Sequence, residues 1–134
     1  MSWDVFIFDA PPDATSVDEL PQDSNPSPLG TGSDIRRCLR ENFPDLDLTD
    51  PAWGQLIGPT WSIEFNIGSD DPVHSIMLHV RGGGDVLAVI ARIVAVVGGR
   101  ALDTSTGEFL TGDSTQTAGW HGFQQYRDQI LRRS

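Results

Sequence analysis

The chain has 134 residues, a single cysteine and a formal net charge of −10 at pH 7. This length supports one compact domain, residues 1–134, whose core needs no disulfide, metal or cofactor to fold. One cysteine without an intrachain partner indicates a reducing compartment, and the N-terminus lacks the basic start and long apolar run of a signal peptide. We therefore expect a cytoplasmic protein that does not span a membrane.

Acidic residues are concentrated in two blocks that contain no basic residue. Residues 1–30 carry six carboxylates and residues 41–80 carry seven, with no Lys or Arg in either block. Such blocks repel a phosphate backbone, which is bound through Lys and Arg, so nucleic acid is excluded as a partner. A basic protein is the better candidate partner. The alternative is an acidic surface that only keeps the chain in solution.

The first elements are predicted from β-forming residues, turn residues and helix caps. Residues 3–9 read as a strand, and residues 10–30, rich in Pro, Asp and Ser, read as an irregular acidic loop. Thr31 then begins a capping box that starts a helix, with Ser33 as the alternative cap, and Pro44 ends this helix. The next residues, 45–54, are expected to form an acidic segment made mainly of turns.

The second half of the chain contains the clearest periodic pattern. Polar and apolar residues alternate over 61–67 and again over 75–81, which predicts a hairpin with one apolar and one polar side. After a glycine turn, Asp85 is expected to cap a helix that runs to residue 97. Residues 101–110 read as a short last strand with a turn, and residues 117–133 as a C-terminal helix.

The predicted order is therefore strand, helix, strand, strand, helix, strand, followed by the C-terminal helix. This is the split βαββαβ arrangement of a ferredoxin-like α+β fold. Right-handed crossovers would place both main helices on one face of the sheet. In this arrangement the strand at residues 61–67 lies at an edge, where its apolar side could pair with another chain.

The glycine turn is the first candidate site. Backbone N–H groups between a strand and a helix can hold an anion, together with the positive end of the helix dipole. The alternative is a tight turn with a cap, because Asp85 would occupy the same donors and the segment is not a phosphate-binding loop. The ligand-binding residues in the first interpretation are His79, Arg81, Gly82, Gly83 and Gly84.

The polar side of the predicted hairpin is the second candidate site. Glu64, His79 and Arg81 could supply an acid, a base and a positively charged group to a reaction. The pattern specifies no nucleophile and no substrate, however, and polar residues on an uncovered sheet face are also the ordinary structural expectation.

A partner-binding surface is the third candidate, and it centres on Trp53. An aromatic side chain beside acidic residues is a good anchor in protein interfaces. Trp61, in contrast, alternates with apolar positions and is expected in the core. A homodimer is left open. The residues expected to contact a basic partner are Asp45, Asp47, Asp50, Trp53, Glu64, Asp70 and Asp71.

Several segments together resemble a group of small uncharacterised bacterial proteins. The resemblance covers most of residues 1–110 and implies no activity and no catalytic residues. Its segments are SWDVFIFD (2–9), DPAWG (50–54), SIEFNIG (62–68), MLHVRGGGD (77–85) and LDTSTGEF (102–109). In size and charge the chain is also similar to immunity proteins, which neutralise toxins.

These observations favour a non-enzymatic, acidic protein-binding module, such as a bacterial immunity protein that neutralises a toxin with a basic site. A small-ligand or anion sensor at the glycine turn is the alternative. An enzyme that uses the polar side of the hairpin comes third.

Overall fold

The computed structural model describes residues 2–11, 14–16, 18, 20, 26–84 and 86–110. The described elements are β1 (Trp3–Phe8), α1 (Gly32–Asn42), β2 (Asp47–Asp50), β3 (Trp53–Ile57), β4 (Trp61–Asn66), β5 (Ser75–Gly82), α2 (Leu87–Val97), β6 (Arg100–Asp103) and β7 (Glu108–Phe109). The N-cap of α2 is Val86, which makes no side-chain cap bond, so the predicted cap at Asp85 is wrong. The C-terminal helix at 117–133 and parts of the loop at 10–30 lie outside the described residues.

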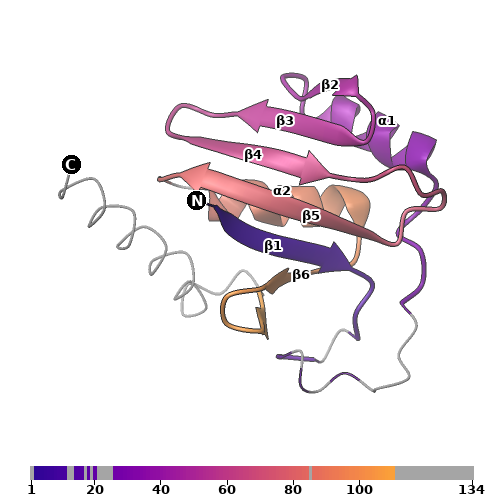
Figure 1. The fold of residues 1–134 in the computed structure, drawn as a ribbon, viewed down its shortest axis with the longest axis vertical. Helices are drawn as coiled ribbons and strands as arrows, with labels where there is room; N and C mark the ends of the chain where they lie inside the picture. The colour runs from indigo at the N-terminus through magenta and orange to yellow at the C-terminus, as the bar shows by residue number, and fades with distance from the viewer. Residues whose placement is uncertain are drawn as a thin grey trace.

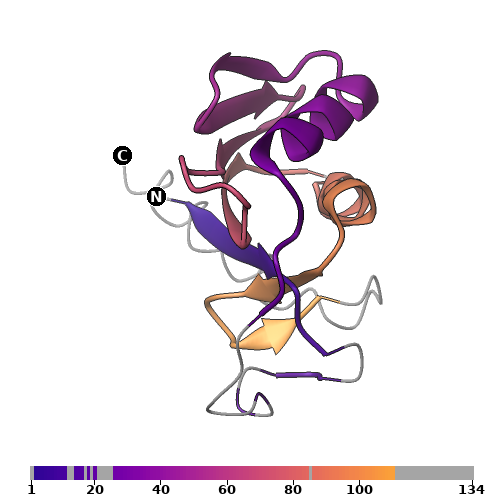
Figure 2. The ribbon, with the colours of Figure 1, turned by 90° about the vertical axis from the view of Figure 1, so that its right-hand side faces the viewer.

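In the described part of the chain, the strands form one antiparallel sheet in the order β2-β3-β4-β5-β1-β6-β7. The first strand of the chain therefore lies inside the sheet, between β5 and β6. Both helices lie on the same face, behind the strands in Figure 1 and to one side of them in Figure 2.

The ferredoxin-like prediction is wrong. The expected βαββαβ order has four strands, whereas the described residues form a sheet of seven. The prediction missed β2, which lies in the segment 45–54 expected to consist of turns, and β3, which begins at the end of that segment. It also missed that residues 101–110 form two short strands. Because β3 pairs with β4 along its length, the expected sheet edge at residues 61–67 is also wrong.

Alternation along the strands divides the side chains between the two faces of the sheet. On the helix-covered face, Val5 and Ile7 of β1 and Ile76, Leu78 and Val80 of β5 are fully buried. The helices contribute Ile35, Leu39, Ile90 and Ile93 to the same core cluster. This continuous apolar layer is the main source of stability in the described part of the molecule.

The predicted start of the first helix is confirmed, with Thr31 rather than Ser33 as the cap. Thr31 is the N-cap of α1, and its side-chain oxygen accepts the backbone N–H of Asp34 at 3.2 Å. At the other end, Arg92 of α2 donates to the Asn42 carbonyl at 3.2 Å and lies 4.9 Å from the centre of the Phe43 ring. The two helices are thereby joined to each other as well as to the sheet.

Among the described residues, those that cover the opposite face of the sheet lie only at one end. There a second apolar cluster joins Phe8, Leu102 and Phe109 to Ala10 and Ala14 of the following loop. The Arg100 guanidinium donates to carbonyl groups of the same loop, including that of Pro11 at 2.7 Å, and holds it against β6 and β7. No described element covers the remainder of this face.

Candidate functional site on the open sheet face

The uncovered surface extends over β3, β4, β5 and the first half of β1, and we call it the open face. It faces the viewer in Figure 1 and is turned away from both helices in Figure 2. Its side chains follow from strand alternation and the pairing register. They are Asp4, Phe6, Trp53, Gln55, Ile57, Ser62, Glu64, Asn66, Met77, His79 and Arg81.

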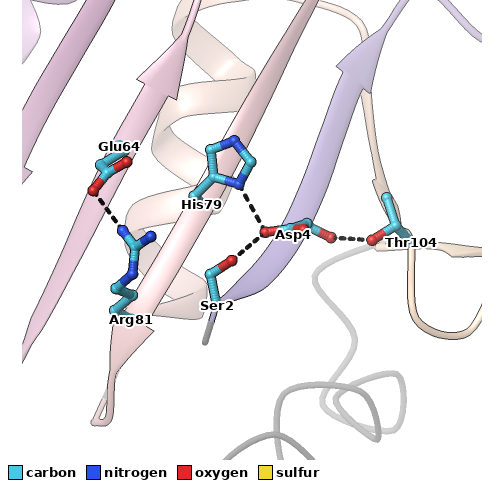
Figure 3. A network of polar contacts seen from close by, with 6 residues as sticks. All are labelled: Ser2, Asp4, Glu64, His79, Arg81 and Thr104. Carbon is cyan, nitrogen blue, oxygen red and sulfur yellow. Dashed lines mark hydrogen bonds and ion pairs between the residues drawn. The ribbon is translucent and has the colours of Figure 1, made fainter.

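A polar network crosses the middle of the open face (Figure 3). Asp4 Oδ1 lies 2.8 Å from His79 Nδ1 and also accepts the Ser2 hydroxyl at 2.6 Å. Because an ionised carboxylate only accepts hydrogen bonds, the imidazole proton in this pair lies on Nδ1. The next pair along β5 is the Arg81 guanidinium, which donates to Glu64 Oε1.

The His79 ring is also held by an aromatic contact. The Trp53 ring lies almost parallel to it, with 5.7 Å between the ring centres and 20° between the planes. Trp53 belongs to β3 and His79 to β5, so the indole reaches across β4 to make this contact. Asp4 on one side and Trp53 on the other fix the orientation of the imidazole.

A cleft of about 450 Å³ lies at one end of the open face, beside the loop that joins β4 to β5. Phe6, Met77 and His79 line it from the sheet, and Asp70 and His74 line it from the loop. Its other lining residues are Asn66, Ile67, Gly68, Val73 and Ser75. Its volume is within the usual range for pockets that bind small groups.

Carboxylates outnumber cations on this surface. Asp47 and Asp50 of β2 pair with Gln55 and Trp53, and directly paired residues share a face. The open face and its β2 border therefore carry four carboxylates, Asp4, Asp47, Asp50 and Glu64, and one guanidinium, Arg81. This arrangement favours a basic partner over an acidic one.

The carboxylate of Asp47 is engaged within its own strand. It accepts the Thr49 hydroxyl at 2.6 Å and the Thr49 backbone N–H at 2.9 Å. These bonds, the hydroxyl first, hold the pKa of Asp47 below its ordinary value because they stabilise the charged form. Asp50 similarly accepts the backbone N–H of Ala52 at 3.0 Å.

The seven residues expected to bind a partner do not all lie on one surface. Asp47, Asp50, Trp53 and Glu64 are on the open face or its border, and Asp70 lines the cleft. Asp45 lies in the exposed turn after α1. The carboxylate of Asp71 accepts the backbone N–H of Gly32 at 3.1 Å, so it stabilises the N-terminus of α1.

The five residues of the alternative anion site do not converge on one point. The Gly83 N–H donates to the Thr60 carbonyl at 2.9 Å, and the Thr60 hydroxyl donates back to the Gly83 carbonyl at 2.8 Å. The Arg81 and His79 side chains are engaged with acidic residues on the open face. The turn is thus tied to the β3–β4 loop, and the anion site stays a prediction.

The residues of the enzyme hypothesis do come together, since Glu64 pairs directly with His79 and binds Arg81. The Ser2 hydroxyl, however, donates to Asp4 and makes no Ser–His pair. Sequence reasoning did not assign Asp4 or Phe6 to a site. The signal was present, because both residues alternate with the buried Val5 and Ile7 and so belong to the other face.

Comparison with protein-family models, with curated proteins and with solved structures found no match for this chain. The resemblance to small bacterial proteins therefore stays a prediction. Among the described residues, no helix has the length and apolarity to cross a membrane, and no three His, Cys, Asp or Glu side chains are grouped to hold a metal ion.

Proposed function

We propose that the chain is a non-enzymatic protein-binding module that engages a basic segment of its partner with the open face. One observation carries the proposal: a sheet face uncovered by described elements combines aromatic and apolar side chains with an excess of carboxylates. A toxin with a basic active site is one such partner, and the chain would then act as its immunity protein.

The apolar part of the open face has the character of an interface centre. Trp53 is half-buried against His79, and Phe6 and Met77 line the adjoining cleft. Ile57, farther along β3, is 73% exposed and is the large apolar residue most open to solvent in the described chain. Burial of such side chains by a partner supplies much of the free energy of binding.

The polar part of the open face favours binding over catalysis. Asp4 binds His79, and Glu64 binds Arg81. These contacts hold the four side chains in place, so their charges form a fixed pattern. A fixed acidic pattern speeds the encounter with a basic partner and loses effect as salt screens it.

The test is affinity capture from a lysate of the source organism at low and high salt, with four versions of the chain as bait. The baits are the wild type, Trp53→Ala, Glu64→Gln and Glu41→Gln. The last variant makes the same charge change at an exposed position of α1, away from the open face. Any captured protein is then purified, and its affinity for each bait is measured by calorimetry.

The proposal predicts a basic protein that binds the wild type and Glu41→Gln equally and that 0.5 M salt releases. Trp53→Ala should weaken its binding at least about tenfold, as expected for an interface anchor. Glu64→Gln should weaken binding more than Glu41→Gln does. Equal capture by all four baits, or capture of acidic proteins only, would contradict the proposal.

A further inference from the structure

We propose that the cleft at the end of the open face receives an arginine side chain of the basic partner. This inference rests on the proposed function and names the chemical group that the site recognises. It follows from three properties of the cleft, namely an unengaged carboxylate, an apolar wall and a suitable size.

The unengaged carboxylate belongs to Asp70. The other carboxylates of this surface already have partners: Asp4 binds His79, Glu64 binds Arg81, and Asp47 binds Thr49. Within the described chain, no hydrogen bond or ion pair satisfies the side chain of Asp70 or that of Asn66. The cleft therefore presents one carboxylate and one amide that can both accept hydrogen bonds from a cation.

The wall of the cleft suits a flat cation on an apolar stem. The Phe6 ring, the Met77 thioether and the His79 ring held by Trp53 line it from the sheet. A guanidinium group is planar, stacks on aromatic faces and binds a carboxylate with two parallel hydrogen bonds. An ammonium group is a more strongly hydrated point charge, so we infer arginine rather than lysine.

The cleft admits a side chain but is small for a folded element. Its volume of about 450 Å³ is at the lower end of the range for small-molecule pockets. It continues into the open face, so a partner segment lying across β4 and β5 could direct one side chain into it. Arg81, the one guanidinium on the open face, is bound to Glu64 and does not line the cleft.

The experiment is a titration of the full chain with N-acetyl-arginine methylamide, followed by NMR of the methionine methyl groups. The chain contains two methionines, Met1 and Met77, so the cleft signal is assigned by comparison with Met77→Leu. The expected result is a saturable shift of the Met77 methyl with a dissociation constant of about 1 mM, the range of a single small group.

Matched probes and variants separate recognition from general attraction. The citrulline analogue has the same shape without the charge, and it should shift the Met77 signal at least about fivefold less. The lysine analogue should bind about threefold more weakly than arginine.

Asp70→Asn should weaken arginine binding about tenfold, as expected for loss of a charge-assisted bond. Glu41→Gln removes one charge from an exposed position of α1, away from the cleft, and should have little effect.

Several outcomes would overturn the inference: no shift of Met77, equal shifts with citrulline, binding of lysine as tight as that of arginine, or equal losses in Glu41→Gln and Asp70→Asn. Failure of the proposed function is separate. If a partner loses affinity for Trp53→Ala but not for Asp70→Asn, the open face binds and the cleft inference is wrong. If arginine binds the cleft and no partner depends on the open face, the proposed function is wrong.

Discussion

Asp103 is a buried carboxylate, 2% exposed, and donors from two residues surround its Oδ1 atom. The Trp3 indole N–H donates to it at 3.0 Å, the Ser105 backbone N–H at 2.9 Å and the Ser105 hydroxyl at 2.6 Å. Through these bonds the side chain joins the start of β1 to the end of β6. We therefore assign Asp103 a structural role rather than one on the open face.

We expect Asp103→Ala to lower the free energy of unfolding by about 2–3 kcal/mol, because buried donors lose their acceptor. Asp103→Asn keeps an oxygen at the same place and should cost clearly less. Urea unfolding of the wild type and both variants checks this. Equal losses for Ala and Asn would show that the acceptor oxygen is not what stabilises this region.

Asp47 allows a pH-dependent prediction at a single residue. Its pKa is lowered from the ordinary value of 3.8, first by the Thr49 hydroxyl and then by the Thr49 backbone N–H. We expect Thr49→Val, which removes only the hydroxyl bond, to raise the pKa of Asp47 toward that ordinary value. NMR titration of the Asp47 side-chain carboxyl in both proteins measures it.

The sign of the effect on stability follows from the same shift. A carboxyl group whose pKa is lower in the folded state stabilises the fold above its unfolded-state pKa, and this contribution disappears as the pH falls through the folded value. The Asp47 contribution should therefore be present at pH 5 and above and disappear below about pH 4. An unchanged titration midpoint in Thr49→Val would contradict the assigned cause.

Some of the open face was predictable residue by residue. Alternation correctly placed Glu64, His79 and Arg81 on one side of the hairpin, because successive strand residues point to opposite faces. The Asp4–His79 contact could not be predicted in this way. Its residues are 75 positions apart, and they meet only because β1 pairs with β5.

At the scale of elements, the glycine turn after β5 is held by its contact with the β3–β4 loop. Gly82 has φ of +91°, and a Cβ atom there would lie 2.4 Å from the Thr60 carbonyl oxygen and 2.8 Å from the Trp61 Cα. Gly68, in the loop after β4, has φ of +81° but no atom within 4 Å of an added Cβ. An alanine at Gly68 would meet backbone strain alone, whereas an alanine at Gly82 would meet the same strain and a steric clash. Comparing the two substitutions therefore separates the two costs.

We expect Gly68→Ala to cost about 1–2 kcal/mol, the penalty for a left-handed conformation. Gly82→Ala should cost clearly more, because backbone atoms on both sides must also move apart. Thermal unfolding of the two variants measures the difference. Equal losses would show that the contact between the turn and the β3–β4 loop adapts without cost.

Elements were predictable where their periodic pattern was long. The strands at 61–67 and 75–81 and the helix beginning at Thr31 were found, with small errors at the ends. β2 and β3 were missed because they have only four and five residues and a Pro-containing turn separates them. Each contributes one or two buried apolar side chains, too few for a clear alternation.

At the scale of the whole molecule, a correct prediction of the sheet order required β2 and β3, the two strands that were missed. β4 and β5 pair as a hairpin, but β1 pairs with β5 and β6 from distant parts of the chain. No local pattern indicates how many further strands extend such a sheet. Adding β2 and β3 beyond β4 moves the edge away from Trp61. The same addition brings Trp53 onto the open face beside His79, so the missed strands also determine the candidate site.

Both edges of the sheet are blocked against pairing with another chain. At the β2 edge, the Thr49 backbone N–H donates to the side chain of Asp47, and in the turn after β2 the Ala52 backbone N–H donates to the side chain of Asp50. At the β7 edge, Glu108 forms a bridge with Ser16, and the Phe109 N–H donates to the Thr15 carbonyl. Unpaired edge strands promote association, and natural proteins block them with charges and covering loops.

We therefore expect the wild-type chain not to associate through its sheet edges, and sedimentation at increasing concentration should show one constant species. The double variant Asp47→Ala and Asp50→Ala removes the side chains that accept the Thr49 and Ala52 backbone N–H groups, and it removes two charges that repel a second copy. It should form dimers or larger species at high concentration. Asp34→Ala with Glu41→Ala removes two charges from α1 instead and should behave like the wild type. If both double variants associate equally, net charge alone keeps the chains apart, and the β2 side chains have no specific blocking role.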